Sequence, residues 1–134
     1  MSLKYMLDTN ICIYLMNKRS HNVIDNVRAN LRDGLCISSI TLGELEYGAS
    51  KSAYYERNII AIQKTLALFN VLDFDDTAAS CYGKVRAALE RKGLSIGPLD
   101  TLIAAHALSK DLIVVTNNSK EFERVDGLRI EDWS

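Results

Sequence analysis

The alternation of short strands and helices along the chain begins with the stretch Lys4-Tyr5-Met6-Leu7-Asp8-Thr9-Asn10. Residues 4–7 are typical of a short buried strand, and a helix is expected directly afterwards over Thr9–Met16. A strand that passes at once into a helix is half of a strand–helix–strand unit. The stretch therefore favours an α/β fold built on a parallel sheet.

Short apolar runs alternate with helical periodicity along the remaining chain. Apolar residues within 55–69, for example, recur at steps of four and three, which is the spacing of one helix face. This alternation predicts a central, mainly parallel sheet covered by helices on both faces, in a single domain over residues 1–134. The expected strands are 4–7, 35–38, 71–74 and 112–116, with an edge strand in 128–133; the expected helices are 9–16, 21–32, 41–48, 55–69, 78–89, 102–109 and a short one from about 119.

The composition excludes several classes of protein. The 134 residues are 48% apolar and 25% charged, which is ordinary for a globular domain and unlike a disordered chain. Sixteen Lys and Arg face seventeen Asp and Glu, so the net charge of −1 is not that of a protein that holds nucleic acid by charge alone. No apolar stretch approaches the 18 or so residues of a membrane span.

The cysteines indicate a reducing compartment, and the cysteines and histidines together do not form the pattern of a metal site. Cys12, Cys36 and Cys81 are odd in number and widely spaced, as expected for buried thiols rather than disulfides or zinc ligands. With only His21 and His106 in the chain, a His-rich metal site is not expected. We expect the protein to act in the cytoplasm, and we expect His106 to pack in the core.

Four acidic residues stand where a parallel sheet binds ligands. Asp8 directly follows the first strand, and Glu44 lies in the first turn of the helix after the second strand. Asp100 follows the Gly97-Pro98 turn, and Glu121 lies in the short helix after the 112–116 strand. Because ligands bind beyond the carboxyl ends of the strands, we expect these acids to share one rim. Clustered carboxylates repel each other unless a cation neutralises them, which indicates a Mg²⁺ or Mn²⁺ site.

Each acid also has a purely structural interpretation. Asp8 and Asp100 are suited to N-caps, and Glu44 is placed to form a T-x-x-E capping box with Thr41. Glu121 would complement a helix dipole. Two aromatic segments are also expected to be structural: Tyr47-Gly48-Ala49 as the end of a helix rather than a stacking platform, and Trp133 as an anchor for the tail.

Taken together, the acidic motifs carry a family resemblance. The segments MLDTN (6–10), TLGEL (41–45), GPLD (97–100) and TNNSKEF (116–122) resemble the motifs of PIN-domain ribonucleases. More closely, the chain is similar to the VapC toxins of bacterial toxin–antitoxin pairs, from about Lys4 to Trp133. The resemblance implies a PIN-like three-layer α/β/α fold.

The resemblance also implies roles for individual residues. The positions that match the family's metal-binding acids are Asp8, Glu44 and Asp100. Thr9 and Thr116 match polar positions beside those acids.

The fourth acidic position departs from the family's pattern, since many PIN domains carry an Asp where this chain has Asn118. Glu121 is then the available fourth catalytic carboxylate, with Asn118 as a supporting residue.

The function implied is that of a Mg²⁺- or Mn²⁺-dependent endoribonuclease toxin. The resemblance implies a homodimer that a VapB-type antitoxin inhibits, with structured RNA as substrate and the tRNA anticodon stem-loop as the leading candidate. Contact with operator DNA is expected only through the antitoxin, and no membrane association is expected. A bound metal would supply hydroxide for attack on a phosphodiester and would neutralise the charge that develops on the phosphate.

Cations outside the four acids are the candidates for holding RNA. Without those acids, sixteen cations face thirteen acids, so the remainder of the chain carries +3. The densest basic segment lies on or beside one helix and consists of Lys84, Arg86, Arg91 and Lys92. RNA contact and a solvated polar face are equally open for this segment.

Two other functions compete with the ribonuclease. A receiver-like α/β binding module needs a Lys after a late strand, where this chain has Thr116-Asn117-Asn118. A D-x-D phosphatase needs a second acid where Asp8-Thr9-Asn10 has an asparagine. The missing Lys counts against the binding module, and the missing second acid counts against the phosphatase.

Overall fold

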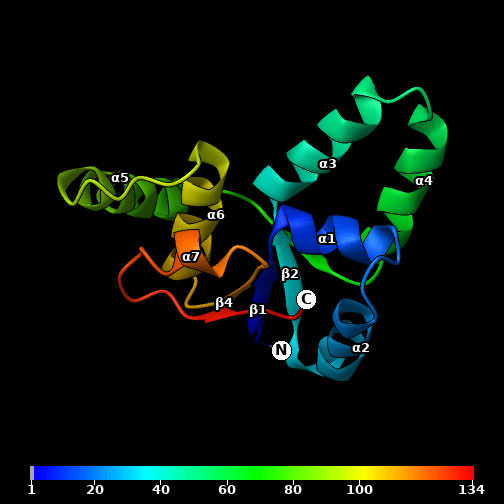
Figure 1. Ribbon diagram of the computed structural model, residues 1–134, viewed down its shortest axis with the longest axis horizontal. Helices are drawn as coiled ribbons and strands as arrows, with labels where there is room; N and C mark the ends of the chain where they lie inside the picture. Colours follow the sequence, from blue (N-terminus) through cyan, green and yellow to red (C-terminus); the bar gives the residue numbers. More distant parts are fainter. Residues whose placement is uncertain (1) are drawn as a thin grey trace.

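Five short parallel strands form the centre of the computed structural model, which describes residues 2–134 (Figure 1). Their order across the sheet is β3-β2-β1-β4-β5, and all four neighbouring pairs are parallel. The chain therefore leaves β1 toward one edge of the sheet and later returns to its other side at β4. The strands are β1 (Tyr5–Leu7), β2 (Leu35–Ser38), β3 (Asn70–Leu72), β4 (Ile113–Val115) and β5 (Ile130–Glu131).

Helices cover both faces of the sheet, and the alternation of side chains along β1 shows how. Tyr5 and Leu7 belong to the core cluster under α1 to α4, whereas Met6 belongs to the cluster under α5, α6 and α7. All three side chains are buried, because each face of the strand is covered. The helices are α1 (Thr9–Met16), α2 (His21–Asn30), α3 (Ser39–Lys51), α4 (Tyr55–Leu66), α5 (Asp76–Arg91), α6 (Pro98–Ser109) and α7 (Ser119–Phe122), and a 3₁₀ turn (Leu31–Asp33) follows α2.

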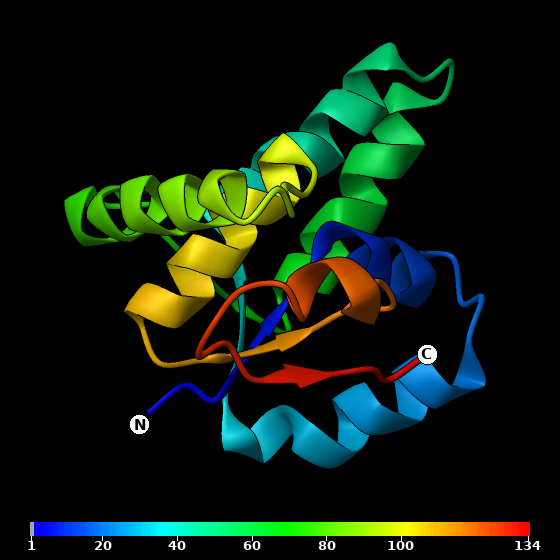
Figure 2. The same cartoon turned by 60° about the vertical axis from the view of Figure 1, so that its left-hand side comes forward.

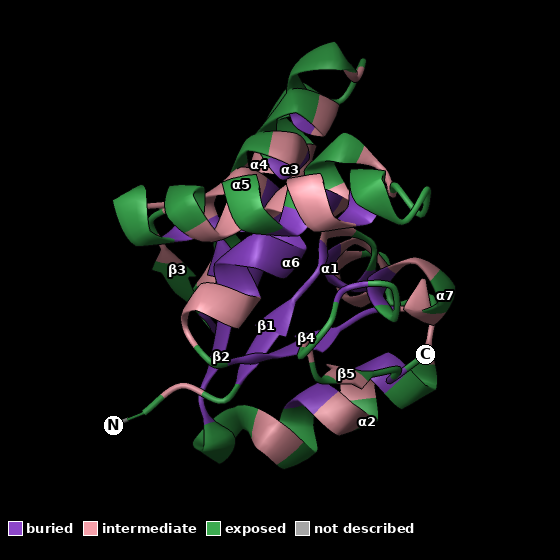
Figure 3. Ribbon diagram, turned by 90° about the vertical axis from the view of Figure 1, so that its left-hand side faces the viewer, coloured by how far each residue is buried: buried purple, intermediate pink, exposed green. Residues whose placement is uncertain are grey.

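The predicted three-layer α/β/α fold is confirmed. Helix α6 is buried along most of its length, because it lies between the sheet and α5 (Figure 3). This position explains the weak apolar periodicity of 102–109, which is buried nearly all round and lacks a polar face.

Helices α2 to α6 begin or end two to four residues away from the predicted bounds, and α6 and α3 show a local cause. Helix α6 starts at Pro98 rather than Leu102, because proline at the first helical position loses no hydrogen bond and its fixed φ suits a helix. Helix α3 runs from Ser39 to Lys51 rather than from 41 to 48. It starts earlier because the Ser38 hydroxyl accepts a hydrogen bond from the Ile40 N–H as the N-cap, and it continues past Gly48.

Helices α3 and α4 form an antiparallel pair that projects from the body of the molecule (Figures 1 and 2). Leu45 and Ala49 of α3 are buried in the same cluster as Ile62 of α4, so the pair packs through small and aliphatic side chains. The outer surfaces of this pair and of its connection stay exposed and include Tyr47 of α3, Tyr54 of the connection and Tyr55 of α4.

Several predictions about single side chains are confirmed. Cys12 and Cys36 are buried free thiols, although Cys81 is only half-buried. Trp133 is buried with its ring edge-on to Tyr5 at a centroid distance of 4.9 Å, and so anchors the tail. His106 is fully buried, with Nδ1 2.8 Å from the Ser38 hydroxyl. Across residues 2–134, none of the helices combines the length and apolar character that a membrane crossing requires.

Candidate active site

The carboxyl ends of β1 and β4 lie next to each other and form the base of the candidate site. The backbone N–H of Asp8, directly after β1, donates to the carbonyl oxygen of Val115 at 3.0 Å. Thr116 follows Val115 at the end of β4. Because the chain runs from β1 to β2 on one side and reaches β4 on the other, this edge is the switch point at which open α/β sheets bind ligands.

Asp8 is buried at this edge, with only 3% of its surface exposed. Its Oδ1 accepts a hydrogen bond from the Ile11 N–H at 2.9 Å, so the predicted N-cap of α1 is present. The pKa of Asp8 is raised to about 6: burial is the largest cause, the charge of Glu44 adds to it, and hydrogen bonds from Thr116 and Ile11 partly offset both. The carboxylate is therefore destabilised where it stands, and a cation would relieve this.

Glu44 reaches the same edge from α3, but the local prediction for it is wrong. It lies in the second turn of α3, and Thr41 is buried inside the helix, so no Thr41–Glu44 capping box forms. The Glu44 carboxylate instead accepts a hydrogen bond from the Thr9 hydroxyl, with Thr9 Oγ1 and Glu44 Oε1 2.8 Å apart. Thr9 thus ties the acid of α3 to the first residue of α1, beside Asp8.

Asp100 lies in the first turn of α6, where Gly97 rather than Asp100 occupies the N-cap, so the predicted N-cap role is wrong. The pKa of Asp100 is raised to about 7, chiefly by burial and then by the hydrogen bond and charge of Glu121, followed by the charges of Asp8 and Glu44. The charges of the other acids thus act on the protonation of Asp8 and Asp100.

Asn118 connects the third and fourth acids. Its Nδ2 donates to Glu121 Oε2 at 2.6 Å and lies 3.5 Å from Asp100 Oδ2. Its backbone N–H donates to the Thr116 hydroxyl at 2.9 Å, which holds the turn after β4 in place. An amide at this position bridges two carboxylates, whereas an aspartate there would add a further negative charge.

Three of the four acids open into one cavity. This cavity, the acidic hollow, has a volume of about 550 Å³ and lies between α1, α3 and the start of α6. Glu121, Thr116 and Asn118 support it without lining it. Its lining residues are Asp8, Thr9, Asn10, Ile13, Glu44, Tyr47, Gly48, Lys51, Gly97, Pro98, Leu99 and Asp100.

The donor set of the acidic hollow suits a hard divalent cation. Within residues 2–134, no three His, Cys, Asp or Glu side chains are already drawn together around one ion position. Glu44 points to Thr9 and Glu121 to Asn118, so these two carboxylates satisfy local donors. The oxygen ligands and the raised pKa values of two acids fit a cation such as Mg²⁺, which binds through few carboxylates and keeps several waters.

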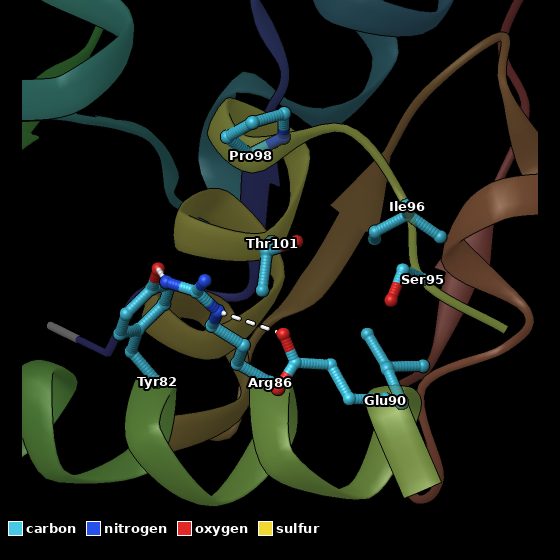
Figure 4. A pocket seen from close by; sticks show the side chains of 8 residues that line it. Tyr82, Arg86, Glu90, Ser95, Ile96, Pro98 and Thr101 are labelled. Atoms are coloured by element: carbon cyan, nitrogen blue, oxygen red, sulfur yellow. Dashed lines mark hydrogen bonds and ion pairs between the residues drawn. The ribbon is translucent and has the colours of Figure 1, made fainter. Parts of the chain in front are cut away.

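The four basic residues expected to hold RNA lie on different sides of α5. Arg86 pairs with Glu90 at 3.3 Å and donates to the Tyr82 hydroxyl at 3.0 Å, beside a pocket of about 230 Å³ (Figure 4). Pro98 lines both this pocket and the acidic hollow. Lys84 and Lys92 line another pocket instead.

Lys92 also forms an ion pair with Asp126, whereas Arg91 is exposed. Of the four cations, Arg86 is thus the one whose pocket adjoins the acidic hollow.

Tyr47 and Lys51 are among the lining residues that the sequence interpretation did not assign to the site. Gly48 was expected to end the helix, but α3 continues to Lys51. Within a continuous helix, positions 44, 47, 48 and 51 share one face, and all four line the acidic hollow. The spacing was present in the sequence, but it has meaning only if the helix continues past Gly48.

The fold and the acids at its switch point define a PIN-domain protein, since the family model described as PIN domain matches residues 5–128. The chain is 53% identical over 133 residues to the tRNA(fMet)-specific endonuclease VapC of Shigella flexneri, covering 98% of this chain and 99% of that protein. The chain therefore belongs to the VapC family of PIN-domain ribonucleases.

Solved structures agree with this assignment. A chain in the DNA-bound VapBC crystal structure from Salmonella typhimurium has a TM-score of 0.94 at 48% identity, with 99% of this chain and 100% of that chain covered. A chain in VapBC2 from Rickettsia felis, bound to a DNA fragment from its promoter, also has a TM-score of 0.94, at 41% identity and with 98% and 100% covered.

Proposed function

We propose that this protein is a metal-dependent endoribonuclease toxin that hydrolyses a phosphodiester bond in structured RNA, with the tRNA anticodon stem-loop as its leading substrate. The observation that carries the proposal is the meeting of Asp8, Glu44 and Asp100 in one hollow at the switch point of the sheet. The Shigella flexneri relative, which is named as acting on tRNA(fMet), supports tRNA as the substrate class.

Asp8, Glu44 and Asp100 would hold Mg²⁺ or Mn²⁺ in the acidic hollow. When bound, the ion supplies Lewis-acid chemistry: a water of lowered pKa and neutralisation of the phosphate charge. Each of the three carboxylates comes from a different element, so the folded chain fixes their directions before RNA arrives.

The neighbouring polar residues orient these acids. Ile11 N–H and Thr116 hold the Asp8 carboxylate, and Thr9 holds Glu44. Asn118 holds Glu121 beside Asp100, from where Glu121 acts on the site through Asp100 or through water. Orientation by such neighbours maintains the ligand geometry that metal-assisted hydrolysis needs.

The protein is proposed to act in the cytoplasm as a homodimer, inhibited by a VapB-type antitoxin. The acidic hollow, without metal, suits a guanidinium group, which pairs with carboxylates through two parallel hydrogen bonds. We propose that the antitoxin inserts a basic side chain near Asp8, Glu44 and Asp100 and so competes with the metal. Contact with operator DNA is proposed to occur only through the antitoxin; the DNA-bound VapBC structures of two relatives support DNA binding by the toxin–antitoxin complex.

Expression of the chain alone is expected to arrest bacterial growth, and co-expression of its cognate antitoxin is expected to restore it. The measurement is viable counts after induction, combined with gel analysis of tRNA from the same cells. A folded, abundant wild-type chain that leaves growth and every tRNA intact would contradict the proposed function and favour a non-enzymatic binding module.

The combined replacement Arg86→Ala and Arg91→Ala is expected to raise the KM for a tRNA stem-loop several-fold with a smaller effect on kcat. Each lost phosphate contact should also reduce the slope of log affinity against log salt by about 0.7–0.9. The measurement is cleavage at several salt concentrations. Arg28→Ala with Arg32→Ala removes the same charge from exposed positions outside the hollow and serves as the control. An unchanged salt slope would assign Arg86 and Arg91 to a solvated surface.

A further inference from the structure

We propose that Tyr47 stacks on an unpaired nucleobase of the RNA at the rim of the acidic hollow, with Lys51 beside it to meet a neighbouring phosphate. The inference rests on the proposed ribonuclease function and specifies the part of the substrate that the site reads. A base can stack on an exposed ring only after it has left its own helix, so the proposal assigns the site to a loop or an end rather than to a paired stem.

Tyr47 is exposed without a packing role. At 66% exposure it is the most exposed of the large apolar side chains in the described residues 2–134, although it lies in the middle of α3. Helix α3 packs against its neighbours through Leu45 and Ala49, which are 5% and 2% exposed. The aromatic surface of Tyr47 is therefore free for a ligand that arrives from outside.

The position of Tyr47 connects it to the proposed chemistry. It lies three residues after Glu44 and four before Lys51, so all three side chains share one face of α3, and all three line the acidic hollow. Gly48 lies on the same face, and a Cβ there would meet nothing within 4 Å, so the surface beside Tyr47 is open. A base on Tyr47 would thus lie close to a phosphate at the acids.

The charges around Tyr47 suit a nucleotide. Lys51 Nζ lies over the Tyr47 ring, 5.1 Å from its centre. The ammonium group thus covers one face of the ring, and the other face is available to a base. Among the residues that line the hollow, Lys51 is the single Lys or Arg, facing Asp8, Glu44 and Asp100. An RNA backbone that enters an otherwise acidic cavity would find its one cationic contact there.

The wall of the hollow formed by α6 offers a second apolar surface. Leu99 is 44% exposed and lines the hollow from α6, whereas Tyr47 lines it from α3. An aromatic ring, an aliphatic side chain and one ammonium group around proposed metal ligands fit a base with its phosphate better than an apolar protein segment. Stacking of this kind tolerates any base, so it would define the shape of the RNA rather than its sequence.

The test compares Tyr47→Ala with Tyr47→Phe and with a matched control, Tyr54→Ala. Tyr54 is 62% exposed and also has a cation over its ring, with Arg57 Cζ at 4.5 Å, but it lies outside the hollow. Alanine favours helix, so Tyr47→Ala is expected to fold, which circular dichroism checks. Cleavage of a tRNA stem-loop is expected to show a KM raised at least about 5-fold for Tyr47→Ala, and unchanged KM values for Tyr47→Phe and Tyr54→Ala.

A second substrate separates stacking from a structural effect. Once the cleavage position has been mapped, the bases flanking it are replaced one at a time by abasic sites. For one of these RNAs, wild type and Tyr47→Ala are expected to have equal KM values, because the base that Tyr47 contacts is gone.

Three results would overturn the inference. One is a loss in Tyr47→Ala that persists on every abasic RNA, and another is an equal loss in Tyr54→Ala. The third is a change in sedimentation or antitoxin binding for Tyr47→Ala with RNA cleavage intact, which would assign the tyrosine to a protein interface. If wild type cleaves RNA normally in these cases, the ribonuclease function stands and the stacking role alone fails; if wild type cleaves no RNA, both fail.

Discussion

Replacing Asp8 with asparagine is expected to lower the rate of RNA cleavage by at least about 100-fold at saturating Mg²⁺. Asparagine keeps the oxygen that caps α1 at Ile11, so the fold is expected to survive while the negative ligand is lost. Asp100→Asn is expected to have an effect of the same order, because Asp100 lies in the same hollow. The measurement is single-turnover cleavage of a tRNA stem-loop by the purified variants.

The control for this experiment is Asp25→Asn, which makes the same chemical change at an exposed position of α2 and is expected to retain full activity. A chelator added to the wild type should reproduce the loss seen in Asp8→Asn. Full activity of both hollow variants, or equal wild-type activity in EDTA and in Mg²⁺, would refute the metal mechanism.

The same substitution is expected to stabilise the metal-free protein at neutral pH. The pKa of Asp8 is raised from 3.8 to about 6 in the folded state, so ionising it there costs folding about 3 kcal/mol. A group with a raised folded pKa imposes no penalty well below its unfolded pKa of 3.8; the penalty grows between pH 3.8 and about 6 and is fully present above about 6. At pH about 7.5, in EDTA, Asp8→Asn is expected to raise the free energy of unfolding by about 2 kcal/mol.

Denaturant unfolding of both proteins at several pH values measures this effect. The difference should shrink as pH falls below about 6 and disappear at pH about 3, where Asp8 is protonated in both the folded and the unfolded state. Saturating Mg²⁺ should reverse the order, since an ion that binds only the folded wild type stabilises it. The same difference in stability at both pH values would show that the Asp8 carboxylate carries no electrostatic penalty in the folded protein.

The local patterns in the chain were sufficient for the fold class and for three of the acids. The strand Tyr5–Leu7 and the helix Thr9–Met16 follow from short-range apolar patterning and the cap at Asp8, which depend on neighbours a few residues apart. The convergence of Asp8, Glu44 and Asp100 also followed, because acids placed after parallel strands, or at a nearby helix start, meet at one edge of the sheet.

Contacts between distant segments decided what the local patterns left open. The motif T-x-x-E at 41–44 matches a capping box, but Ser38 is the N-cap of α3, so the helix begins before Thr41. The donor to Glu44 is instead Thr9, 35 residues away in the chain. Glycine often ends a helix, yet α3 continues past Gly48 to Lys51, because Leu45 and Ala49 are buried in the same core cluster as Ile62 of α4. A helix continues where its buried face gains enough from packing to offset the entropy that glycine loses.

The sequence by itself therefore determined the layers, the sheet and the identity of the acids, because these depend on periodicity and on the order of elements. The tertiary structure decided how the acids are supported and what shares their cavity. Asn118 bridging Asp100 and Glu121, and Tyr47 beside Lys51 on the rim, involve segments that meet only after folding. The orientation of a side chain depends on partners far along the chain, and no local pattern specifies them.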